Sequence, residues 1–445
     1  MHIQAKDFTI FIKSILEEYF INKKVLDVGA GDINGNNRFL FTNCEYEGND
    51  VISANNVTIV SKTKDLPFED NSFDTIISTE CFEHDSEYEL SFKKIYKMLK
   101  PNGLFLFTCA STGRGEHGTR RTSPNDSYGT IGHIEDMQDY YKNLTIYDID
   151  EIIELDKIFY FWKSYYNNIS NDLYFFGIKR NENDINNENK YNKLFESLDE
   201  DNSPIKYHNN KNIFCIDKNT KLDECSKILV KYNTDKNFFF HNYGRQYNEI
   251  FKKYKNNKVN VLELGILNGE SLKFYKEYFN NYNLILGIDN NPNCLRYISN
   301  KDNINVEILN LGDIRSYEII KNKYKNFDII IDDASHLNTH MILSFENLFE
   351  SLNEGGVYII EDTIVYKDTR FNDTSKPNIL DYIFQYTKYL NQWRYDSTEG
   401  VKDHCVDPYK IQKKTNNIFE YGIDRIEYGC SYIAIYKKTR HHWIE

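Results

Sequence analysis

The chain repeats itself, and this repeat restricts the folds that it can adopt more than any other feature of the sequence. Three segments of the first half have counterparts in the second half, in the same order. Such a repeat indicates that both halves are built as the same kind of unit. The matched pairs are KKVLDVGAGD (23–32) with VNVLELGILNG (259–269), NSFDTIISTE (71–80) with KNFDIIIDDA (325–334), and MLKPNGLFLFTCA (98–110) with SLNEGGVYIIEDT (351–363).

Each half alternates short apolar runs with amphipathic segments. It begins with a strand, a glycine turn and a helix, and further strands and helices follow. This alternation is typical of a doubly wound parallel sheet with helices on both faces. At 445 residues the chain is also too long for one ordinary core. We therefore predict an α/β protein with two Rossmann-like domains, each a mostly parallel seven-stranded sheet flanked by helices.

The segment between the two halves is polar. Residues 181–204, NENDINNENKYNKLFESLDEDNSP, contain almost no branched apolar side chains, which is typical of a linker. We predict a first domain at 1–180, a polar linker at 181–205 and a second domain at 206–445.

Charge and cysteine content limit the setting in which the chain works. It has 54 basic and 67 acidic side chains and a formal net charge of -13, which disfavours nucleic acid as a partner. The eight cysteines include no CxxC pair, which argues against a zinc site or a disulfide framework and favours a reducing compartment. No segment approaches the roughly 20 apolar residues of a membrane span, and the N-terminus does not resemble a signal peptide. We expect a soluble, cytoplasmic protein.

Acidic residues follow two strands of the second half. The strand at 327–331 leads into Asp332 and Asp333, and the next strand in the sheet leads into Glu361 and Asp362. Neighbouring strands lie roughly 4.8 Å apart, and ligands of open α/β sheets bind at the carboxyl ends. Clustered carboxylates repel one another unless a cation neutralises them, and oxygen ligands favour a hard ion. We predict that Asp333, Glu361 and Asp362 bind Mg²⁺. The alternative is that Asp332 or Asp333 caps the turn that follows and that Glu361 is a solvated strand end.

The order of motifs in both halves resembles the class I S-adenosylmethionine-dependent methyltransferases. A glycine loop follows the first strand, an acidic residue closes the second, and an FD strand and a Gly-turn strand come later. Neither half has the GxGxxG spacing of a nicotinamide-binding domain. The second half, with KYNTDKNFFFHNYGRQYNEIF (231–251), LELGILNGESLKFY, IDDASH and YIIEDT, resembles the magnesium-dependent sugar O-methyltransferases of antibiotic biosynthesis and their cephalosporin-hydroxylase-like relatives.

This resemblance implies that S-adenosylmethionine binds in both halves. Glycines let the backbone approach the ligand, and acidic residues hold its amino group, ribose and adenine. One departure concerns the adenine in the first half, where VSKTKD puts Lys62 or Asp65 in place of the usual acidic residue. The implied cofactor residues are Asp27, Gly29, Gly31 and Asp50 in the first half, and Glu263, Gly265, Gly269, Asp289, Asp313 and Asp332 in the second.

His336 follows Asp333 at the spacing D-x-x-H. A sugar hydroxyl is a poor nucleophile until it loses its proton, and an imidazole is suited to accept that proton at neutral pH. The resemblance implies that His336 is the catalytic base and that Asp333 and the metal beside it hold and polarise the hydroxyl. The alternative is a histidine that caps a helix or is buried and hydrogen bonded.

The first half carries its own candidate site. Glu80, Glu83 and His84 form an E-x-x-E-H word, which some methyltransferases combine with a later histidine, here His133, to bind a divalent cation. His84 acting alone as a base is the alternative. The loop at 110–133 is basic and fits an anionic acceptor, unless it is simply solvated. Its basic residues are Arg114, His117, Arg120 and Arg121.

These features together predict a bifunctional S-adenosylmethionine-dependent O-methyltransferase. The second domain methylates a sugar hydroxyl with Mg²⁺ and a histidine base, and the first methylates another position of the same glycan or nucleotide-sugar precursor. A homo-oligomer is compatible with the sequence. One rival is a single-activity enzyme whose first domain is a binding or scaffolding module. The other is a nucleic-acid methyltransferase, which the acidic charge disfavours.

Overall fold

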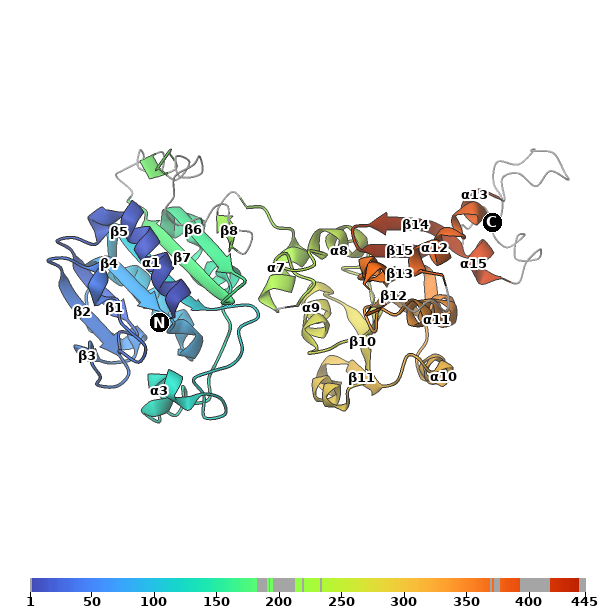
Figure 1. Cartoon of the computed structure of the whole chain (residues 1–445), viewed down its shortest axis with the longest axis horizontal. Coiled ribbons are helices and arrows are strands. Elements are labelled where there is room, and N and C mark those ends of the chain that lie inside the picture. The colour runs from blue at the N-terminus through green and yellow to red at the C-terminus, as the bar shows by residue number, and fades with distance from the viewer. Residues whose placement is uncertain are drawn as a thin grey trace. The chain divides into compact units, whose positions relative to one another are not determined.

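We describe the protein from a computed structural model. The chain divides into two compact units, residues 1–244 and 245–445, and each unit contains one sheet (Figure 1). The two units are described separately. The structure describes residues 2–181, 190–191, 193–194, 213–217, 220–232, 234–368, 370–371, 377–392 and 417–439.

The sheet of the first unit has the strand order β3-β2-β1-β4-β5-β7-β6-β8. The strands from β3 to β5 are parallel, and β7, β6 and β8 are antiparallel to their neighbours. The strands are β1 (Lys24–Val28), β2 (Glu45–Asp50), β3 (Ile59–Val60), β4 (Phe73–Thr79), β5 (Leu99–Ala110), β6 (Phe159–Asn167), β7 (Asp172–Lys179) and β8 (Ile213–Asp217).

Helices cover both faces of this sheet because side chains alternate along each strand. Leu104 of β5 belongs to one apolar cluster with Phe8 of α1, and its neighbour Phe105 belongs to another with Phe92 of α2 and Ile149 of α4. In Figure 1, α1 crosses in front of the sheet. The helices are α1 (Ile3–Ile15), α2 (Tyr88–Met98), α3 (Tyr128–Ile131), α4 (Ile146–Ile153), α5 (Leu155–Ile158) and α7 (Glu224–Lys231).

The first sheet has eight strands, so the predicted count of seven is wrong there. Its eighth strand, β8, comes from the region predicted to begin the second domain, yet it pairs with β6. The unit boundary also lies later in the chain than the predicted 206. Most of the predicted linker lies outside the described residues. Tyr191 within it is buried, and its hydroxyl lies 2.8 Å from the hydroxyl of Tyr19 in the first unit.

The second sheet has the strand order β11-β10-β9-β12-β13-β15-β14, with seven strands as predicted. The strands from β11 to β13 are parallel, and the hairpin of β14 and β15 is antiparallel. Both sheets confirm the predicted α/β class. The strands are β9 (Val259–Leu264), β10 (Tyr282–Asp289), β11 (Ile304–Ile308), β12 (Phe327–Asp332), β13 (Leu352–Ile360), β14 (Ile423–Gly429) and β15 (Tyr432–Lys437).

Helices α10, α11 and α12 share one apolar cluster with β9, β12 and β13. Helices α8 and α9 form an aromatic cluster in which Phe251 packs beside Phe274. No helix in the described ranges is long and apolar enough to cross a membrane. The helices are α8 (Gly244–Phe251), α9 (Glu270–Tyr278), α10 (Ile314–Lys323), α11 (Asn338–Leu348), α12 (Ile379–Phe384), α13 (Thr387–Gln392) and α15 (Ile418–Tyr421).

Candidate active sites

The carboxyl ends of β9, β12 and β13 meet at one edge of the second sheet. Asp332 is in register with Leu264 of β9 and with Ile360 of β13. Beyond the strands, the Asp333 amide donates to the Leu264 carbonyl at 2.9 Å, and the Glu361 amide donates to the Asp332 carbonyl at 3.0 Å. This register brings both predicted acidic pairs to the edge where ligands of such sheets bind.

Asp333, His336 and Asp362 come together at this edge. One possible ligand atom from each lies within 4.8 Å of the others. His336 Nε2 lies 4.0 Å from Asp333 Oδ1 and 3.9 Å from Asp362 Oδ2. His336 and Asp362 both have left-handed backbones, with φ of 56° and 51°. Such conformations are costly for non-glycine residues and are concentrated at functional sites, so this cluster is the candidate active site of the second unit.

The composition of the cluster differs in part from the predicted metal site. Asp333 and Asp362 lie in it, but the third member is His336, which the sequence suggested as a base. Glu361 is fully buried and is outside this group. Asp362 lies two residues beyond the end of β13 and has a left-handed backbone, so the alternation of side chains along the strand no longer relates its direction to that of Glu361. The role of Glu361 as a ligand stays a prediction.

Asp289 closes the second strand of this sheet against the glycine loop. Its Oδ2 accepts hydrogen bonds from the amides of Ile266 and Leu267, both at 3.0 Å. Gly265, at the start of the loop, has φ of +86°, and a Cβ built there would lie 2.2 Å from the backbone oxygen of Asp333. Gly269 has φ of +70°. The loop thus passes closely over the end of β12, as a ligand-binding turn requires.

The other predicted cofactor residues of the second unit are held by local partners. Glu263 is fully buried and accepts hydrogen bonds from the hydroxyls of Ser271 and Tyr275 on α9. Asp332 is also buried and accepts one from Tyr358 at 3.2 Å; burial raises the pKa of Asp332 to about 7 against this hydrogen bond.

Asp313 caps α10 and is ion-paired with Arg315 at 2.5 Å. Its predicted contact with the adenine, like the cofactor roles of Glu263 and Asp332, stays a prediction.

We expect Gly265→Ala to destabilise the second unit by roughly 2–5 kcal/mol, because it combines a left-handed alanine with overpacking against backbone. Gly355→Ala is the matched control: its φ is +73°, but a Cβ there meets only the end of the Thr439 side chain. Its expected loss is about 1–2 kcal/mol. Denaturant unfolding of both variants measures the difference, and equal losses would contradict the close approach at Gly265.

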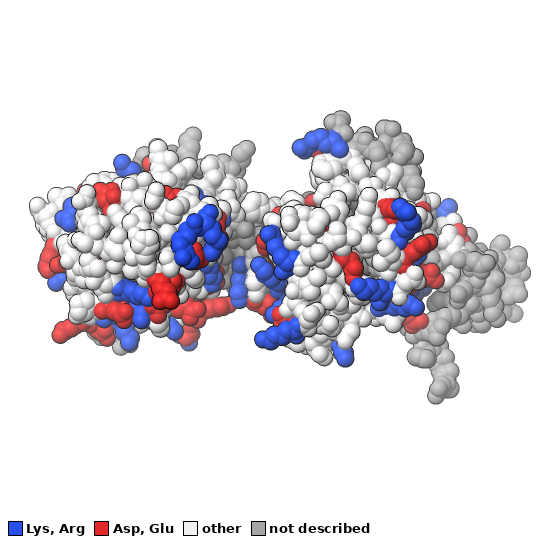
Figure 2. All heavy atoms as spheres, turned by 90° about the horizontal axis from the view of Figure 1, so that it is seen from below, with Lys and Arg blue, Asp and Glu red and all other residues white. Residues whose placement is uncertain are grey.

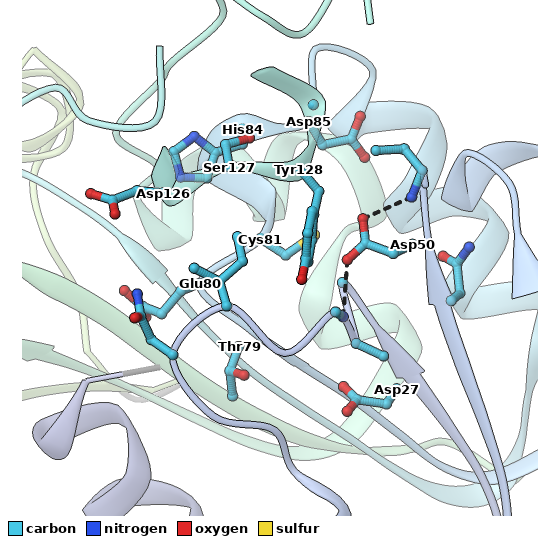
Figure 3. Close-up of a pocket in the computed structure, with 18 of the residues that line it drawn as sticks. Asp27, Asp50, Thr79, Glu80, Cys81, His84, Asp85, Asp126, Ser127 and Tyr128 are labelled. Carbon is cyan, nitrogen blue, oxygen red and sulfur yellow. Dashed lines mark hydrogen bonds between the residues drawn. The ribbon is translucent and has the colours of Figure 1, made fainter. Parts of the chain in front are cut away.

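In the first unit, the four predicted cofactor residues line one pocket (Figure 3). Asp50 repeats the arrangement of Asp289, because its Oδ2 accepts from the Gly31 amide at 3.0 Å and its Oδ1 from the Val51 amide at 2.7 Å. Burial raises the pKa of Asp50 to about 6 and that of Asp27 to about 7, although hydrogen bonds oppose both shifts. Asp27, Gly29, Gly31 and Asp50 thus share one pocket, and their role in binding the cofactor stays a prediction.

Tyr128 is a pocket residue that the sequence did not reveal. It comes from the segment after β5, and its ring lies between Cys81 and Asp50 (Figure 3). A Cβ built on Gly31 would lie 2.0 Å from this ring. The only signal in the sequence is an aromatic residue in a loop that commonly builds an acceptor pocket.

At the predicted adenine position, Lys62 rather than Asp65 lines the pocket. The Lys62 ammonium is paired with Glu87 at 2.9 Å and with Asp136 at 2.6 Å. A lysine with two acidic partners thus lines this part of the pocket, and its position near the adenine stays a prediction.

The E-x-x-E-H word does not form one site with His133. Glu80 groups with His2 and Asp172, whereas Glu83 and His84 group with His117. His133 is exposed and is outside both groups. The predicted set of four ligands is therefore corrected. Its error has a physical cause: Glu80 lies between β4 and the 3-10 helix Phe82–His84 and has a left-handed backbone with φ of 53°, so it is not directed to the same place as Glu83 and His84.

The basic loop after β5 is largely neutralised by its own contacts. Arg120 Nε donates to Asp139 and Arg121 Nε to Glu116, each at 3.0 Å. Arg114 donates to the Ser170 carbonyl at 2.6 Å and lies 3.4 Å from Asp172. These pairs reduce the positive charge that an anionic acceptor would meet.

His2 forms an ion-pair cluster with the buried Asp172 at 2.9 Å and with the partly exposed Glu80 at 3.2 Å. Burial lowers the pKa of His2, but its hydrogen bonds to Asp172 and Glu80 outweigh burial and raise the pKa to about 10. Because this folded-state value exceeds the ordinary 6.5, the stabilisation is fully present below pH 6.5 and is lost as the pH rises towards 10.

We expect His2→Gln to lower the free energy of unfolding by on the order of 2 kcal/mol near pH 6 and by much less near pH 10. Unfolding of both proteins across this range measures the effect, with the exposed His133→Gln as control. A loss that does not change with pH would contradict the ion-pair cluster.

Comparisons with known proteins find methyltransferases that are similar to parts of the chain. Residues 26–107 match the family model of a methyltransferase domain, a range that contains Asp27, Gly29, Gly31 and Asp50. The chain is 32% identical over 152 residues to mycinamicin VI 2''-O-methyltransferase of Micromonospora griseorubida, which is 32% of this chain and 37% of the relative.

Two Streptomyces proteins are similar. Identity is 32% over 146 residues with demethylmacrocin O-methyltransferase of Streptomyces fradiae, which is 31% of this chain and 36% of that protein. The identity is 28% over 147 residues with 8-demethyl-8-alpha-L-rhamnosyl tetracenomycin-C 2'-O-methyltransferase of Streptomyces olivaceus. This match covers 30% of this chain and 36% of that protein. The chain thus matches only about a third of the length of these relatives.

Among solved structures, MycE methyltransferase from the mycinamycin biosynthetic pathway, in complex with Mg and SAH, is similar at 23% identity. The match covers 49% of this chain and 55% of that one, with a TM-score of 0.42.

Proposed function

We propose that the chain is an S-adenosylmethionine-dependent methyltransferase with one cofactor site in each unit, and that the second unit methylates a sugar hydroxyl. One observation carries the proposal. In both units, the carboxylate that closes the second strand accepts hydrogen bonds from backbone amides of the glycine loop, at Asp50 and at Asp289. The methyltransferase-domain match over residues 26–107 supports the same reading.

His336 is placed in the second site where a general base is needed. Methyl transfer forms a carbon–oxygen bond and breaks the carbon–sulfur bond of the sulfonium, and the hydroxyl proton must leave. His336 Nε2 lies about equally far from Asp333 and Asp362. A hydroxyl held by these two residues would therefore have an imidazole beside it to accept its proton.

The donor set fits the Mg²⁺ that the family resemblance implies. Asp333 and Asp362 offer carboxylate oxygens, the ligands that this ion prefers, and they come from adjacent strand ends. We infer that these two residues hold the ion and that Glu361 is a further ligand. A bound Mg²⁺ supplies a Lewis acid beside the acceptor oxygen.

The class of acceptor is inferred from the relatives. Two of them are named as 2''-O- and 2'-O-methyltransferases, and the second name includes a rhamnosyl group. We propose a sugar, nucleotide sugar or glycan as substrate of the second unit and another position of the same molecule for the first. The rival nucleic-acid reading gains no support from the face shown in Figure 2, where basic side chains of the described residues lie among acidic ones.

Cofactor titration tests the proposal and its single-activity rival. We expect S-adenosylhomocysteine to bind the full chain at two sites by isothermal titration calorimetry. Asp50→Ala should weaken one site and Asp289→Ala the other, each roughly 10- to 100-fold, because each removes a charged acceptor from the glycine loop.

Asp65→Ala, in an exposed residue outside the pocket, is the matched control and should retain both sites. A single site that only Asp289→Ala weakens would make the first unit a non-catalytic module. Mass spectrometry of candidate sugars after incubation with the cofactor then identifies the acceptor by the gain of a methyl group.

A further inference from the structure

A second group of metal-binding side chains lies in the first unit. Glu83 and His84 belong to the short 3-10 helix Phe82–His84 that follows β4, and His117 lies in the loop after β5. One possible ligand atom of each lies within 4.8 Å of the others. The rings of His84 and His117 are nearly perpendicular, with centroids 5.0 Å apart. Thus three donors from two separate segments converge on one point.

Two members of this group, Glu83 and His84, are buried and have polar atoms without a hydrogen-bond partner in the part of the chain that the structure describes. Glu83 is fully buried and His84 is 6% exposed. Neither carboxylate oxygen of Glu83, nor His84 Nδ1, has a hydrogen-bond partner of normal geometry among the described residues; the same holds for the nearby Tyr141 hydroxyl. Buried polar groups without partners cost free energy and call for an explanation, such as an ion.

The loop after β5 is shaped to reach His84. Gly118, next to His117, has φ of +67°, and a Cβ built there would lie 2.5 Å from His84 Cε1. Only a glycine allows this approach without a shift of the ring. His117 is itself half-buried, and its Nδ1 lies 3.1 Å from the Gly115 carbonyl. If Nδ1 carries the proton, Nε2 is left as the ligand atom, which is the usual arrangement of a metal-binding histidine.

We propose that Glu83, His84 and His117 bind a divalent transition-metal ion in the first unit. Two imidazoles and one carboxylate select ions of the zinc or iron(II) type rather than Mg²⁺, which prefers oxygen ligands alone. Zn²⁺ holds such ligands at about 2.0–2.2 Å, so the three donors approach one another further on binding. The loop that carries His117 supplies this movement.

The ion would act on the acceptor of the first unit. His84 and His117 line the same pocket as Asp27 and Asp50, and Figure 3 shows His84 and Asp27 towards opposite ends of it. Three protein ligands leave at least one coordination position open, as in catalytic zinc sites. Because His84 and His117 line the pocket, an acceptor bound there could supply an oxygen or nitrogen donor to that position. This site does not depend on the function proposed for the second unit.

Zinc titration of the full chain tests the site. The parent protein carries Asp333→Asn and Asp362→Asn, which removes the carboxylates of the second unit's cluster, and is freed of metal by dialysis against a chelator. We expect calorimetry to find one Zn²⁺ site in this parent. His117→Ala should weaken it at least about 100-fold, since even outer-shell changes cost 10- to 100-fold. Glu83→Gln should have a similar effect.

His133→Ala is the matched control, because His133 is exposed, lies in the same region and was the ligand suggested by sequence spacing. It should leave the affinity unchanged. Co²⁺ gives a second readout: its visible absorption band in the parent should vanish in His117→Ala, while circular dichroism confirms that this loop variant is folded. The proposal is overturned if the parent binds no Zn²⁺, or if His117→Ala binds it as the parent does, which would indicate adventitious binding elsewhere.

Discussion

Asp362→Asn should lower methyl transfer by the second unit at least about 100-fold, the scale on which metal sites respond to lost ligands. Asparagine keeps the shape of the side chain but removes the negative charge that a divalent cation needs. It also tolerates the left-handed backbone at this position, where φ is 51°. The loss should therefore come from the site and not from misfolding. Initial rates with a sugar acceptor at saturating cofactor measure it.

Chelation by EDTA should produce the same loss in the unchanged protein, and Mg²⁺ should restore the rate. Asp368→Asn is the matched control, because Asp368 belongs to the same unit and is ion-paired with Arg370 at 2.5 Å instead of lying in the cluster. Its rate should stay at the parent level. Full activity in EDTA, or in Asp362→Asn, would remove the cation from the proposed mechanism.

The two sheets could be predicted because their strands are buried. Parallel strands covered on both faces appear as nearly continuous apolar runs, such as residues 327–331, and the repeat places them in order. The position of strand β8 in the first sheet could not be predicted. It is a short strand after a long polar segment, and it pairs with β6 at a sheet edge. Which edge accepts a strand is decided by tertiary contacts that no local pattern contains.

The candidate sites could also be predicted from the sequence only in part. Asp50 and Asp289 were predictable because each ends a strand, and parallel strands end at one edge. The E-x-x-E-H word failed because Glu80 directly follows β4 and lies before the 3-10 helix that carries Glu83 and His84, and because the path of the loop after β5 brings His117, not His133, to His84. Gly118 is the one local signal of that approach, and its meaning depends on the position of His84.

His336→Asn should lower the turnover number of the second unit by about 10²- to 10⁴-fold, the range that general base catalysis contributes. Asparagine accepts the left-handed backbone of His336, where φ is 56°, but it cannot accept a proton at neutral pH. Cofactor binding should be unchanged, because the glycine loop is held by Asp289 and not by His336. Single-turnover rates at saturating cofactor and acceptor measure the effect.

The dependence on Mg²⁺ distinguishes the two roles that the cluster allows His336. If it is the base, His336→Asn loses turnover at every Mg²⁺ concentration, and the concentration for half-maximal rate stays the same. If it is a metal ligand, more Mg²⁺ restores the rate. His340→Asn is the matched control, since His340 lies on α11 and hydrogen bonds Ser335 at 2.8 Å. An equal loss in both variants would point to disturbed packing, because His336, unlike His340, lies beside both Asp333 and Asp362.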